Sequence, residues 1–470
     1  MTEWHGLLAT QPALFLLLLL PLLLLPLGAP AAARGVSEAP PARPAPAAAE
    51  GKSSPRGGRA ERRAVAWWGW AAARIAAAAA LVDARPRTVL NAVCLAVGCL
   101  SAYEIAWQPA FVNDWPAHLH HVEQWREGRL DYEYYMHYHG HNAYPAAFLY
   151  TYTALATATG GSIRGFQVLW ALVEVASLRA IGETTLQLQH GAVIACLPAL
   201  SNRLHLYHTR VVTNDGLNVA LMLCAVRLVA AGRGVAGSLL YALTLALKLN
   251  FVTYLPAWLW VLWRGGGGGW TGAGRALSGG GLIVGVQVLA GAPFLLGNAR
   301  AYLAGAYNLG RSLLWDKTRV FRFVGRHLFG AAPWHRFLLG VTAGTISCVL
   351  LAADRRCRLA RRQRLRPGWP EAAARGAAGV SPREALFVLL AANQMAVGWA
   401  RALYTPFLAW NLYALPLVLA LAGVRTAEVV LLFVGVELLF RPFAVGASDA
   451  WAGVWLLLIN LRITYACIVR

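Results

Sequence analysis

The chain has 470 residues, of which 58% are hydrophobic and only 13% are charged. Soluble proteins carry about 25% charged residues, so this composition excludes an ordinary soluble domain and indicates a membrane protein. The formal net charge is +21, but the Lys and Arg residues lie mainly between apolar segments. The chain also lacks the basic and aromatic surface of a single-strand binder, and nucleic acid is therefore excluded as a partner.

The first 87 residues differ from the remainder. Residues 1–33 hold a Leu-rich run and resemble an apolar anchor or a signal peptide, although the positively charged start of a signal peptide is missing. Residues 34–87 begin with a stretch rich in Pro, Ala, Gly, Ser and Arg, which is typical of a disordered linker. The Ala- and Trp-rich residues 64–84 predict a helix lying at the membrane surface.

Residues 88–470 contain a succession of apolar segments, many of them long enough to cross about 30 Å of hydrocarbon. We expect an all-α, polytopic membrane domain with about ten to twelve transmembrane helices. The predicted spans are 88–108, 144–160, 167–187, 191–207, 211–231, 237–263, 280–297, 337–353, 384–402, 405–424, 427–443 and 450–468.

The charged loops between these spans predict which side of the membrane each loop faces. The Arg-rich loop 354–383 is expected in the cytosol. The segment 298–336 is also basic, yet only the predicted span 337–353 separates it from that loop. If the span crosses once, the segment 298–336 is luminal despite its charge, where it suits an anionic ligand such as phosphate. The alternative is a re-entrant span with both loops in the cytosol.

Asp114 and Trp115 follow the first predicted span, in a loop (109–143) that is crowded with His, Tyr and carboxylates. Low-dielectric surroundings favour the protonated form of a carboxylate and so make it a better proton acceptor. Asp114 is therefore the candidate general base. The alternative is a helix N-cap, because an Asp followed two positions later by Pro116 suits the start of a helix.

Histidines in the same loop allow a second interpretation. His137, His139 and His141 alternate, an arrangement that can bind zinc on an extended strand. The alternative is an aromatic and polar loop at the membrane interface. No Cys completes a zinc set, and the loops lack the Asp-x-Asp pair that holds the metal ion of a nucleotide-sugar donor. We therefore expect no metal site and no cofactor.

Polar residues at the edge of an apolar segment, or inside one, are the remaining candidates, because such residues are usually functional in membrane proteins. Arg210, Asn214 and Asp215 precede the apolar segment 216–226, and Lys248 interrupts the predicted span 237–263. For Lys248 the alternative is a side chain that extends to the membrane surface, and Arg401 is similar.

Several motifs together carry a family resemblance. The stretch from Asn113 to Gln167 holds Asp114–Trp115, Gly128, Asp131–Tyr132 and Tyr144–Pro145–Ala146. It resembles the patterns I-D-W-x-A-Y-M, G-x-x-D-Y and V-Y-P-A-G of the dolichyl-phosphate-mannose α-1,3-mannosyltransferases, enzymes of N-glycan precursor synthesis. The likeness covers about residues 88–425 and continues in S-N-R-L-H, R-V-V-T-N-D, K-L-N, G-A-P-F-L, N-L-G-R, F-R-F, S-P-R-E-A and R-A-L-Y.

The resemblance implies a GT-C type glycosyltransferase of the endoplasmic reticulum membrane, with a luminal active site. It implies mannose transfer from dolichyl-phosphate-mannose to the five-mannose dolichyl-diphosphate oligosaccharide, in α-1,3 linkage and with inversion. Asp114 would be the catalytic base, and no obligatory metal is needed. The residues expected to contact donor or acceptor are Trp115, Asp131, Tyr132, Tyr144, Arg210, Asn214, Asp215, Lys248, Arg311, Arg322, Arg401 and Trp410.

The sequence departs from the family near its C-terminal half, where the family pattern H-Y-Q-F-Y-x-W-Y is replaced by Y-T-P-F-L-A-W-N. Phe407 and Trp410 retain the family side chains there. Two alternatives remain. A different polyprenyl-phosphate-sugar-dependent glycosyltransferase of the same architecture is the nearer one. A membrane transporter is more distant, because transporters usually contain internal repeats and no repeat is visible in this sequence.

Overall fold

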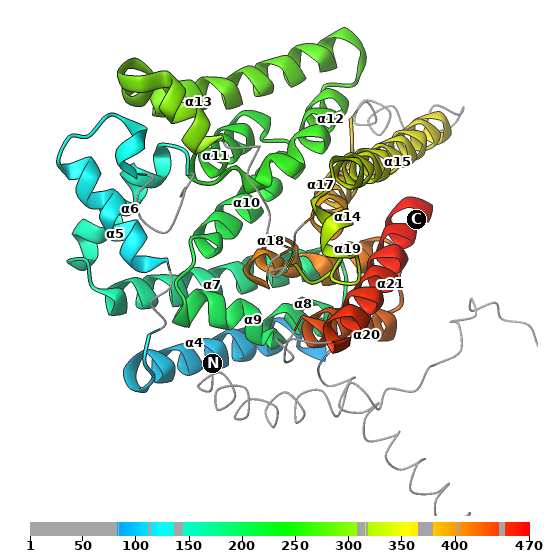
Figure 1. Cartoon of the computed structure of the whole chain (residues 1–470). Helices are drawn as coiled ribbons and strands as arrows, with labels where there is room; N and C mark the ends of the chain where they lie inside the picture. Colours follow the sequence, from blue (N-terminus) through cyan, green and yellow to red (C-terminus); the bar gives the residue numbers. More distant parts are fainter. Residues whose placement is uncertain are drawn as a thin grey trace, which may run out of the picture. The chain divides into compact units, whose positions relative to one another are not determined.

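The computed structural model describes residue 82 and residues 84–470 except 111–113, 136–143, 308–314, 316–317, 365–378, 402, 404 and 441–446. The chain divides into residues 1–85 and 86–470, and the second unit is the membrane domain. The predictions for residues 1–33 and for nearly all of 34–87 lie outside the described residues. Within the described ranges every regular element is a helix (Figure 1).

The longer helices are, in chain order, α4 (Pro86–Trp107), α5 (Trp115–Arg126), α6 (Ala147–Thr159), α7 (Ile163–Gln187), α10 (Asp215–Ala230), α11 (Gly234–Leu247), α12 (Leu255–Gly265), α13 (Gly269–Ala306), α15 (Ala332–Arg364), α17 (Pro382–Gly398), α20 (Thr426–Leu439) and α21 (Ala447–Val469). The shorter elements are η1 (Tyr132–Tyr135), α8 (Ala192–Cys196), η2 (Leu197–Leu200), α9 (Asn202–His205), η3 (Leu206–Arg210), η4 (Leu249–Tyr254), α14 (Arg326–Gly330), η7 (Thr405–Leu408), α18 (Ala409–Leu412) and α19 (Leu415–Leu421).

Every predicted span contains helix, so the expected all-α polytopic architecture is confirmed. By length and apolar composition, five described helices can cross a membrane: α4, α7, α13, α15 and α21. A sixth crossing arises if residues 202–230, which bend by 115°, form one broken span. This count is below the expected ten to twelve for two reasons. Four predicted spans hold single helices of 13 to 17 residues (α6, α10, α17 and α20), and the span 237–263 is divided at Lys248.

The start of two central helices follows from local sequence. Ser162 caps α7, with its side chain accepting a hydrogen bond from the Gly165 N–H. Ser381 caps α17 in the same way through the Glu384 N–H, and Pro382 occupies the first turn, where its missing N–H costs nothing. Every residue of α17 from Glu384 to Gly398 is buried. This helix is therefore central to the membrane domain.

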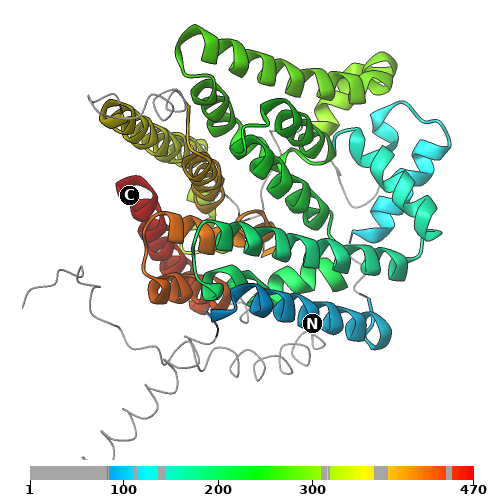
Figure 2. The same ribbon diagram turned by 180° about the vertical axis from the view of Figure 1, so that it is seen from behind.

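The helices pack in a continuous series. α7 packs against α4 and α10, α10 packs against α11, and α11 and α12 both pack against α13. Figures 1 and 2 show this series from opposite sides. α17 contacts α10, α12 and α15, and it joins the series to the C-terminal helices α20 and α21 through α19. Within this arrangement, the candidate site residues lie at the ends of helices or at breaks between them.

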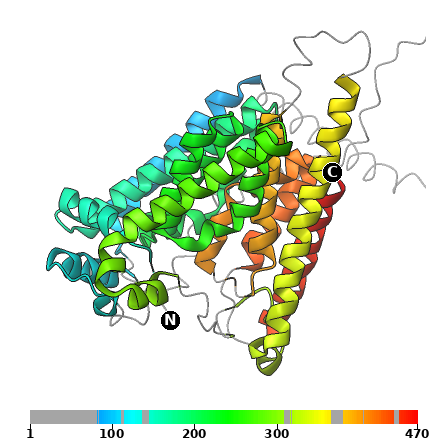
Figure 3. The same ribbon diagram turned by 90° about the horizontal axis from the view of Figure 1, so that it is seen from above.

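The two basic segments lie at opposite ends of α15, which is one helix of 33 residues (Figure 3). At 1.5 Å per residue it is about 50 Å long, enough to cross the hydrocarbon once. Near its start His335 contacts Arg401 at 2.5 Å, and near its end Arg356 binds Glu384 at 2.8 Å. A continuous helix of this length favours a single crossing over the re-entrant alternative, and the sides of the two basic segments stay a prediction.

Candidate active site

Asp114 lies at the N-cap position of α5, with Pro116 in the first turn, as the alternative interpretation expected. Its side chain, however, makes no capping hydrogen bond to the helix. The next residue, Trp115, is buried and packs edge-on against Phe166 with 4.3 Å between ring centroids. Trp115 thus anchors α5 in the apolar core, and the Asp114 carboxylate is not used as a helix cap.

Two arginines hold the loop that leads to Asp114. Arg210 is buried and donates a hydrogen bond from Nη2 to the Pro109 carbonyl at 3.2 Å. Arg164, on the first turn of α7, donates to the Gln108 carbonyl at 2.9 Å. Both bonds fix the backbone at Gln108 and Pro109, at the end of α4 and ahead of Asp114 in the chain.

The segment that carries Arg210 is anchored by a buried ionic network. His205 lies between two carboxylates, with its ring nitrogens 3.2 Å from Glu104 and 3.1 Å from Glu174. Thr209 donates to Glu174 at 3.2 Å. Glu104 belongs to α4 and Glu174 to α7, so this network ties the π-helix η3 to two membrane spans and positions Arg210.

Lys248 and Asp215 form a buried ion pair. The Lys248 ammonium is 2.6 Å from an Asp215 oxygen and 2.9 Å from the Asn214 amide oxygen. The same Asp215 oxygen accepts a hydrogen bond from the Trp410 indole at 2.6 Å. The two charged side chains are only 14% and 4% exposed. The sequence placed Lys248 inside one long span, whereas the structure ends α11 there and starts η4 at the next residue.

Aromatic rings enclose the ammonium group. Lys248 Nζ lies 5.7 Å from the ring centroids of Tyr144, Phe407 and Trp410. Phe407 and Trp410 are stacked at 4.4 Å. Ring faces attract cations, and the attraction grows where water is excluded. The two side chains retained from the family pattern thus both contact the cation.

Amide side chains fix the broken backbone around Lys248. Asn218 donates to the Asn250 side chain at 2.8 Å and to the Lys248 carbonyl at 3.4 Å. Asn393, in the middle of the buried helix α17, donates to the Trp410 carbonyl at 2.8 Å. Thr253 donates to Asn393 at 2.9 Å. Backbone groups freed by the helix breaks therefore find partners inside the protein, as an apolar environment requires.

One face of α6 joins Asp114 to the Lys248–Asp215 pair. Phe148 and Tyr152 stack on this face, and Tyr144, which precedes the helix, continues the stack; successive ring centroids are 4.5 and 4.2 Å apart. The carboxylates of Asp114 and Asp215 both act electrostatically on the Tyr152 hydroxyl. Both carboxylates are therefore near the same hydroxyl although about a hundred residues separate them in the sequence.

Asp131 and Tyr132 act on neighbouring protein groups. The Asp131 carboxylate accepts hydrogen bonds from Asn298 at 3.1 Å and from the Glu133 N–H at 3.0 Å. Asn298 is the residue at which α13 departs from helical geometry. Tyr132 is buried and donates from its hydroxyl to the Tyr144 carbonyl. Both residues thus bond to other parts of the protein, and their expected contact with substrate stays a prediction.

Among the remaining candidate arginines, those that the structure describes contact other side chains. Arg322 stacks on Trp315, 3.8 Å from the ring centroid, and donates to the Trp315 carbonyl at 2.9 Å. Arg401 contacts His335 at 2.5 Å. Arg311 lies outside the described residues, as do His137, His139 and His141. Over the described ranges, no three His, Cys, Asp or Glu side chains are arranged to hold a metal ion.

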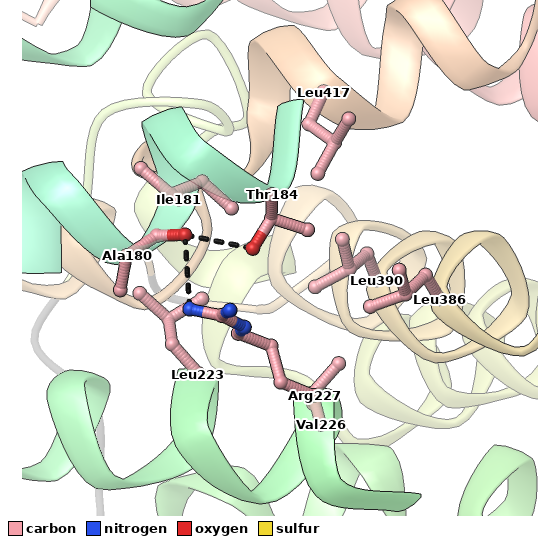
Figure 4. Close-up of a pocket in the computed structure, with 9 residues that line it drawn as sticks. All are labelled: Ala180, Ile181, Thr184, Leu223, Val226, Arg227, Leu386, Leu390 and Leu417. Atoms are coloured by element: carbon pink, nitrogen blue, oxygen red, sulfur yellow. Dashed lines mark hydrogen bonds between the residues drawn. The ribbon is translucent and has the colours of Figure 1, made fainter. Parts of the chain in front are cut away.

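An apolar pocket lies elsewhere in the fold (Figure 4). Its polar members are Thr184 and Arg227, which both bond to the Ala180 carbonyl, at 2.7 and 3.4 Å. Arg227 is about three turns along α10 from Asp215, or about 18 Å. The other lining residues are Ile181, Leu223, Val226, Leu386, Leu390 and Leu417. The pocket is therefore separate from the candidate site.

His118, Tyr152 and Asn393 belong to the site although the sequence did not single them out. For His118 the available signal is its spacing of one helical turn from Asp114. Tyr152 shares a helix face with Tyr144, a regularity visible once a helix is assumed. Asn393 is a polar residue inside the predicted span 384–402, and the same rule that selected Lys248 applies to it.

The sequence model of the ALG3 protein family matches residues 93–447. The chain belongs to this family. The matched range includes every candidate residue from Asp114 to Trp410, and the family expected from the motifs is confirmed.

Three relatives show how far the likeness extends. The chain is 30% identical to the Dol-P-Man:Man(5)GlcNAc(2)-PP-Dol alpha-1,3-mannosyltransferase of Neurospora crassa, over 75% of this chain and 84% of the relative. It is 28% identical to the Homo sapiens protein of that name, over 71% and 76%. It is 26% identical to that of Arabidopsis thaliana, over 75% and 82%. No solved structure gives a significant match.

Proposed function

We propose that this protein transfers mannose from dolichyl-phosphate-mannose, in α-1,3 linkage, to the five-mannose dolichyl-diphosphate oligosaccharide. Family membership and the printed names of the relatives support this reaction. The observation that carries the chemistry is that α5, which begins at Asp114, and the buried cation Lys248 adjoin the same ring: His118 of α5 lies 6.0 Å from the Tyr144 ring centroid and Lys248 Nζ lies 5.7 Å from it.

Asp114 serves as the general base in this reaction. It accepts the proton of the 3-hydroxyl group of an acceptor mannose while that oxygen attacks the anomeric carbon of the donor. The bond from this carbon to the phosphate oxygen breaks, and dolichyl phosphate leaves with the electron pair. Because attack and departure occur on opposite faces, the β-linked donor gives an α-linked product.

Lys248 stabilises the departing phosphate. An ammonium has three N–H donors, and among the described residues two of them bond to Asn214 and Asp215. The third is available to a phosphate oxygen, in surroundings that exclude most water and so strengthen the interaction. A lipid phosphate held this way needs no divalent ion. Arg311, Arg322 and Arg401 remain candidates for further phosphate contacts.

The side of the membrane follows from charge. α15 and α17 both have one end near Trp410 and Arg401 and the other near the Arg-rich residues 355–362. If these arginines are cytosolic, the end that carries Asp114 is luminal. We therefore propose an active site in the lumen of the endoplasmic reticulum, with both lipid-linked substrates reaching it from the bilayer.

A transfer assay with purified protein tests the proposal. We expect mannose to pass from dolichyl-phosphate-mannose to the five-mannose lipid-linked acceptor, with a product cleaved by an α-1,3-specific mannosidase. Asp114→Asn should lower the rate by about 10²- to 10⁴-fold, because a general base typically contributes that much. Glu123→Gln, an exposed change on the same helix, is the matched control. A product of another linkage, or an Asp114→Asn enzyme of normal rate, would contradict the assignment.

A further inference from the structure

We propose that His118 and Tyr152 together bind a hydroxyl group of a substrate sugar beside Asp114. The inference rests on the proposed mannosyl transfer and adds a pair of binding residues to it. Tyr152 belongs to α6, His118 belongs to α5 and packs against it, and neither was a candidate in the sequence.

His118 is buried, with 1% of its surface exposed. Its ring lies against those of Tyr144, Phe148 and Tyr152, with centroids 6.0, 5.2 and 4.8 Å away. Among the described residues, neither of its ring nitrogens has a hydrogen-bond partner. A buried polar group without a partner costs about 1–3 kcal/mol, so native proteins rarely keep one unless a ligand or a bound water supplies the bond.

Tyr152, whose ring packs against that of His118, also has a buried polar group without a partner among the described residues. It is 2% exposed, and its hydroxyl has no hydrogen-bond partner in the described parts of the chain. The Asp114 and Asp215 carboxylates are both close enough to act on this hydroxyl electrostatically. Three polar atoms without partners, from two side chains whose rings are 4.8 Å apart, are thus clustered near the proposed base.

The chemistry of the pair favours a hydroxyl ligand over a phosphate. Burial, together with the charges of His121 and Lys248, lowers the pKa of His118 to about 3. The ring is therefore neutral at physiological pH, with one nitrogen as donor and the other as acceptor. A sugar hydroxyl can both donate and accept, which matches a neutral imidazole beside a phenol. An anionic phosphate would instead be drawn to the ammonium of Lys248.

Removal of the Tyr152 hydroxyl distinguishes a role in substrate binding from a role in stabilising the fold. Tyr152→Phe should slow mannose transfer about tenfold, the value of one hydrogen bond of about 1.4 kcal/mol, while the thermal midpoint of the substrate-free protein stays equal or rises. Tyr241→Phe is the matched control, because the Tyr241 hydroxyl is buried but already donates to the Phe251 carbonyl at 2.8 Å. This control should lose thermal stability and keep its transfer rate.

Deoxy substrates identify the hydroxyl. The wild-type protein should use one deoxymannosyl donor or one deoxy acceptor about tenfold more slowly, and that penalty should vanish in Tyr152→Phe and in His118→Phe. The donor arm and the acceptor arm distinguish the two sources of the hydroxyl. His118→Gln, which keeps a donor and an acceptor, should recover part of the rate lost in His118→Phe.

These experiments distinguish a failure of the sugar-binding inference from a failure of the proposed mannosyl transfer. If the wild-type protein transfers mannose while Tyr152→Phe and His118→Phe keep the full rate, a bound water is the partner of these groups, and the inference is wrong although the function stands. The same conclusion follows if Tyr152→Phe loses stability as Tyr241→Phe does. If the wild-type protein transfers no mannose, the function itself fails.

Discussion

Replacement of Lys248 by Met tests the ionic centre of the site. The variant keeps most of the side-chain volume but leaves the Asp215 carboxylate, 4% exposed, without its counter-charge. Removal of one partner of a buried ion pair costs about 3–5 kcal/mol. We expect the lower value, about 3 kcal/mol, because Trp410 still donates to Asp215 and the Lys248 side chain keeps 14% exposure.

The double variant Lys248→Met/Asp215→Asn separates stability from catalysis. It removes both charges, so the unpaired carboxylate no longer destabilises the fold, and most of the lost stability should return. Transfer should stay about 10²- to 10³-fold slower than in the wild type, because the leaving phosphate still lacks its cation. Thermal unfolding in detergent and initial rates of mannose transfer, measured on the same preparations, give the two quantities.

Two results would refute this reasoning. Equal stability of the single and double variants would mean that Lys248 and Asp215 are not energetically coupled. Recovery of the transfer rate in the double variant would mean that Lys248 serves only to neutralise Asp215 and does not act on phosphate. Arg179→Met is a suitable control, since its ion pair with Glu183 is about half exposed on the arginine side and should contribute less than about 1 kcal/mol.

Two further predictions concern buried groups around the site. Glu174→Gln should lower the free energy of unfolding by about 3 kcal/mol and slow transfer, because Glu174 holds His205 and Thr209 and through them the Arg210 segment. Thermal unfolding measures this loss, with Glu183→Gln on the same helix as the control. Equal losses of stability in the two variants would contradict the prediction. His118→Phe should flatten the fall in stability between pH 6.5 and pH 4 by about 1.4 kcal/mol per pH unit. The unfolded chain binds a proton at His118 below pH 6.5, whereas the pKa of about 3 keeps the folded residue neutral. Parallel wild-type and variant curves would contradict this reasoning.

Helix positions could be predicted from the sequence because the length of an apolar segment and the residues that cap a helix are local features of the chain. The first predicted span, 88–108, agrees with α4 (Pro86–Trp107). Polar residues at span edges could also be selected, and Lys248, Asn214 and Asp215 do contact one another. The selection of polar residues at span edges could not predict which of them pair with one another. Lys248 and Asp215 lie on different helices, and only the packing of α10 against α11 brings their ends together.

Other features could not be predicted because they depend on neighbours distant in sequence. The span 237–263 has the length of one tilted helix, yet the backbone breaks at Lys248, where the residue is extended (φ −159°). The break becomes acceptable only when Asn218 binds the Lys248 carbonyl. Similarly, His118 looks like a loop histidine until α6 covers it with three aromatic rings.

The helix breaks have a common physical explanation. An unbroken membrane helix satisfies its own backbone and presents only side chains, so it cannot direct backbone and polar groups toward an anionic lipid substrate. Here the chain bends by 115° between residues 202–210 and α10, and Val212 adopts a left-handed backbone conformation (φ +53°) within the bend. A β-branched residue in that conformation is strained. Strain of this kind persists where surrounding contacts fix it, and here it sets Asn214 and Asp215 against Lys248.

The charge of this centre also suits its task. Lys248 and Asp215 are together neutral, so the substrate-free site does not leave an isolated charge buried near hydrocarbon. In the proposed reaction a lipid phosphate would give the ammonium a second anion, while Asp215 would keep its hydrogen bond from Trp410. Departure of the phosphate restores the neutral pair. A lone buried lysine would hold the product phosphate more tightly and slow its release, so the paired carboxylate favours turnover as well as folding.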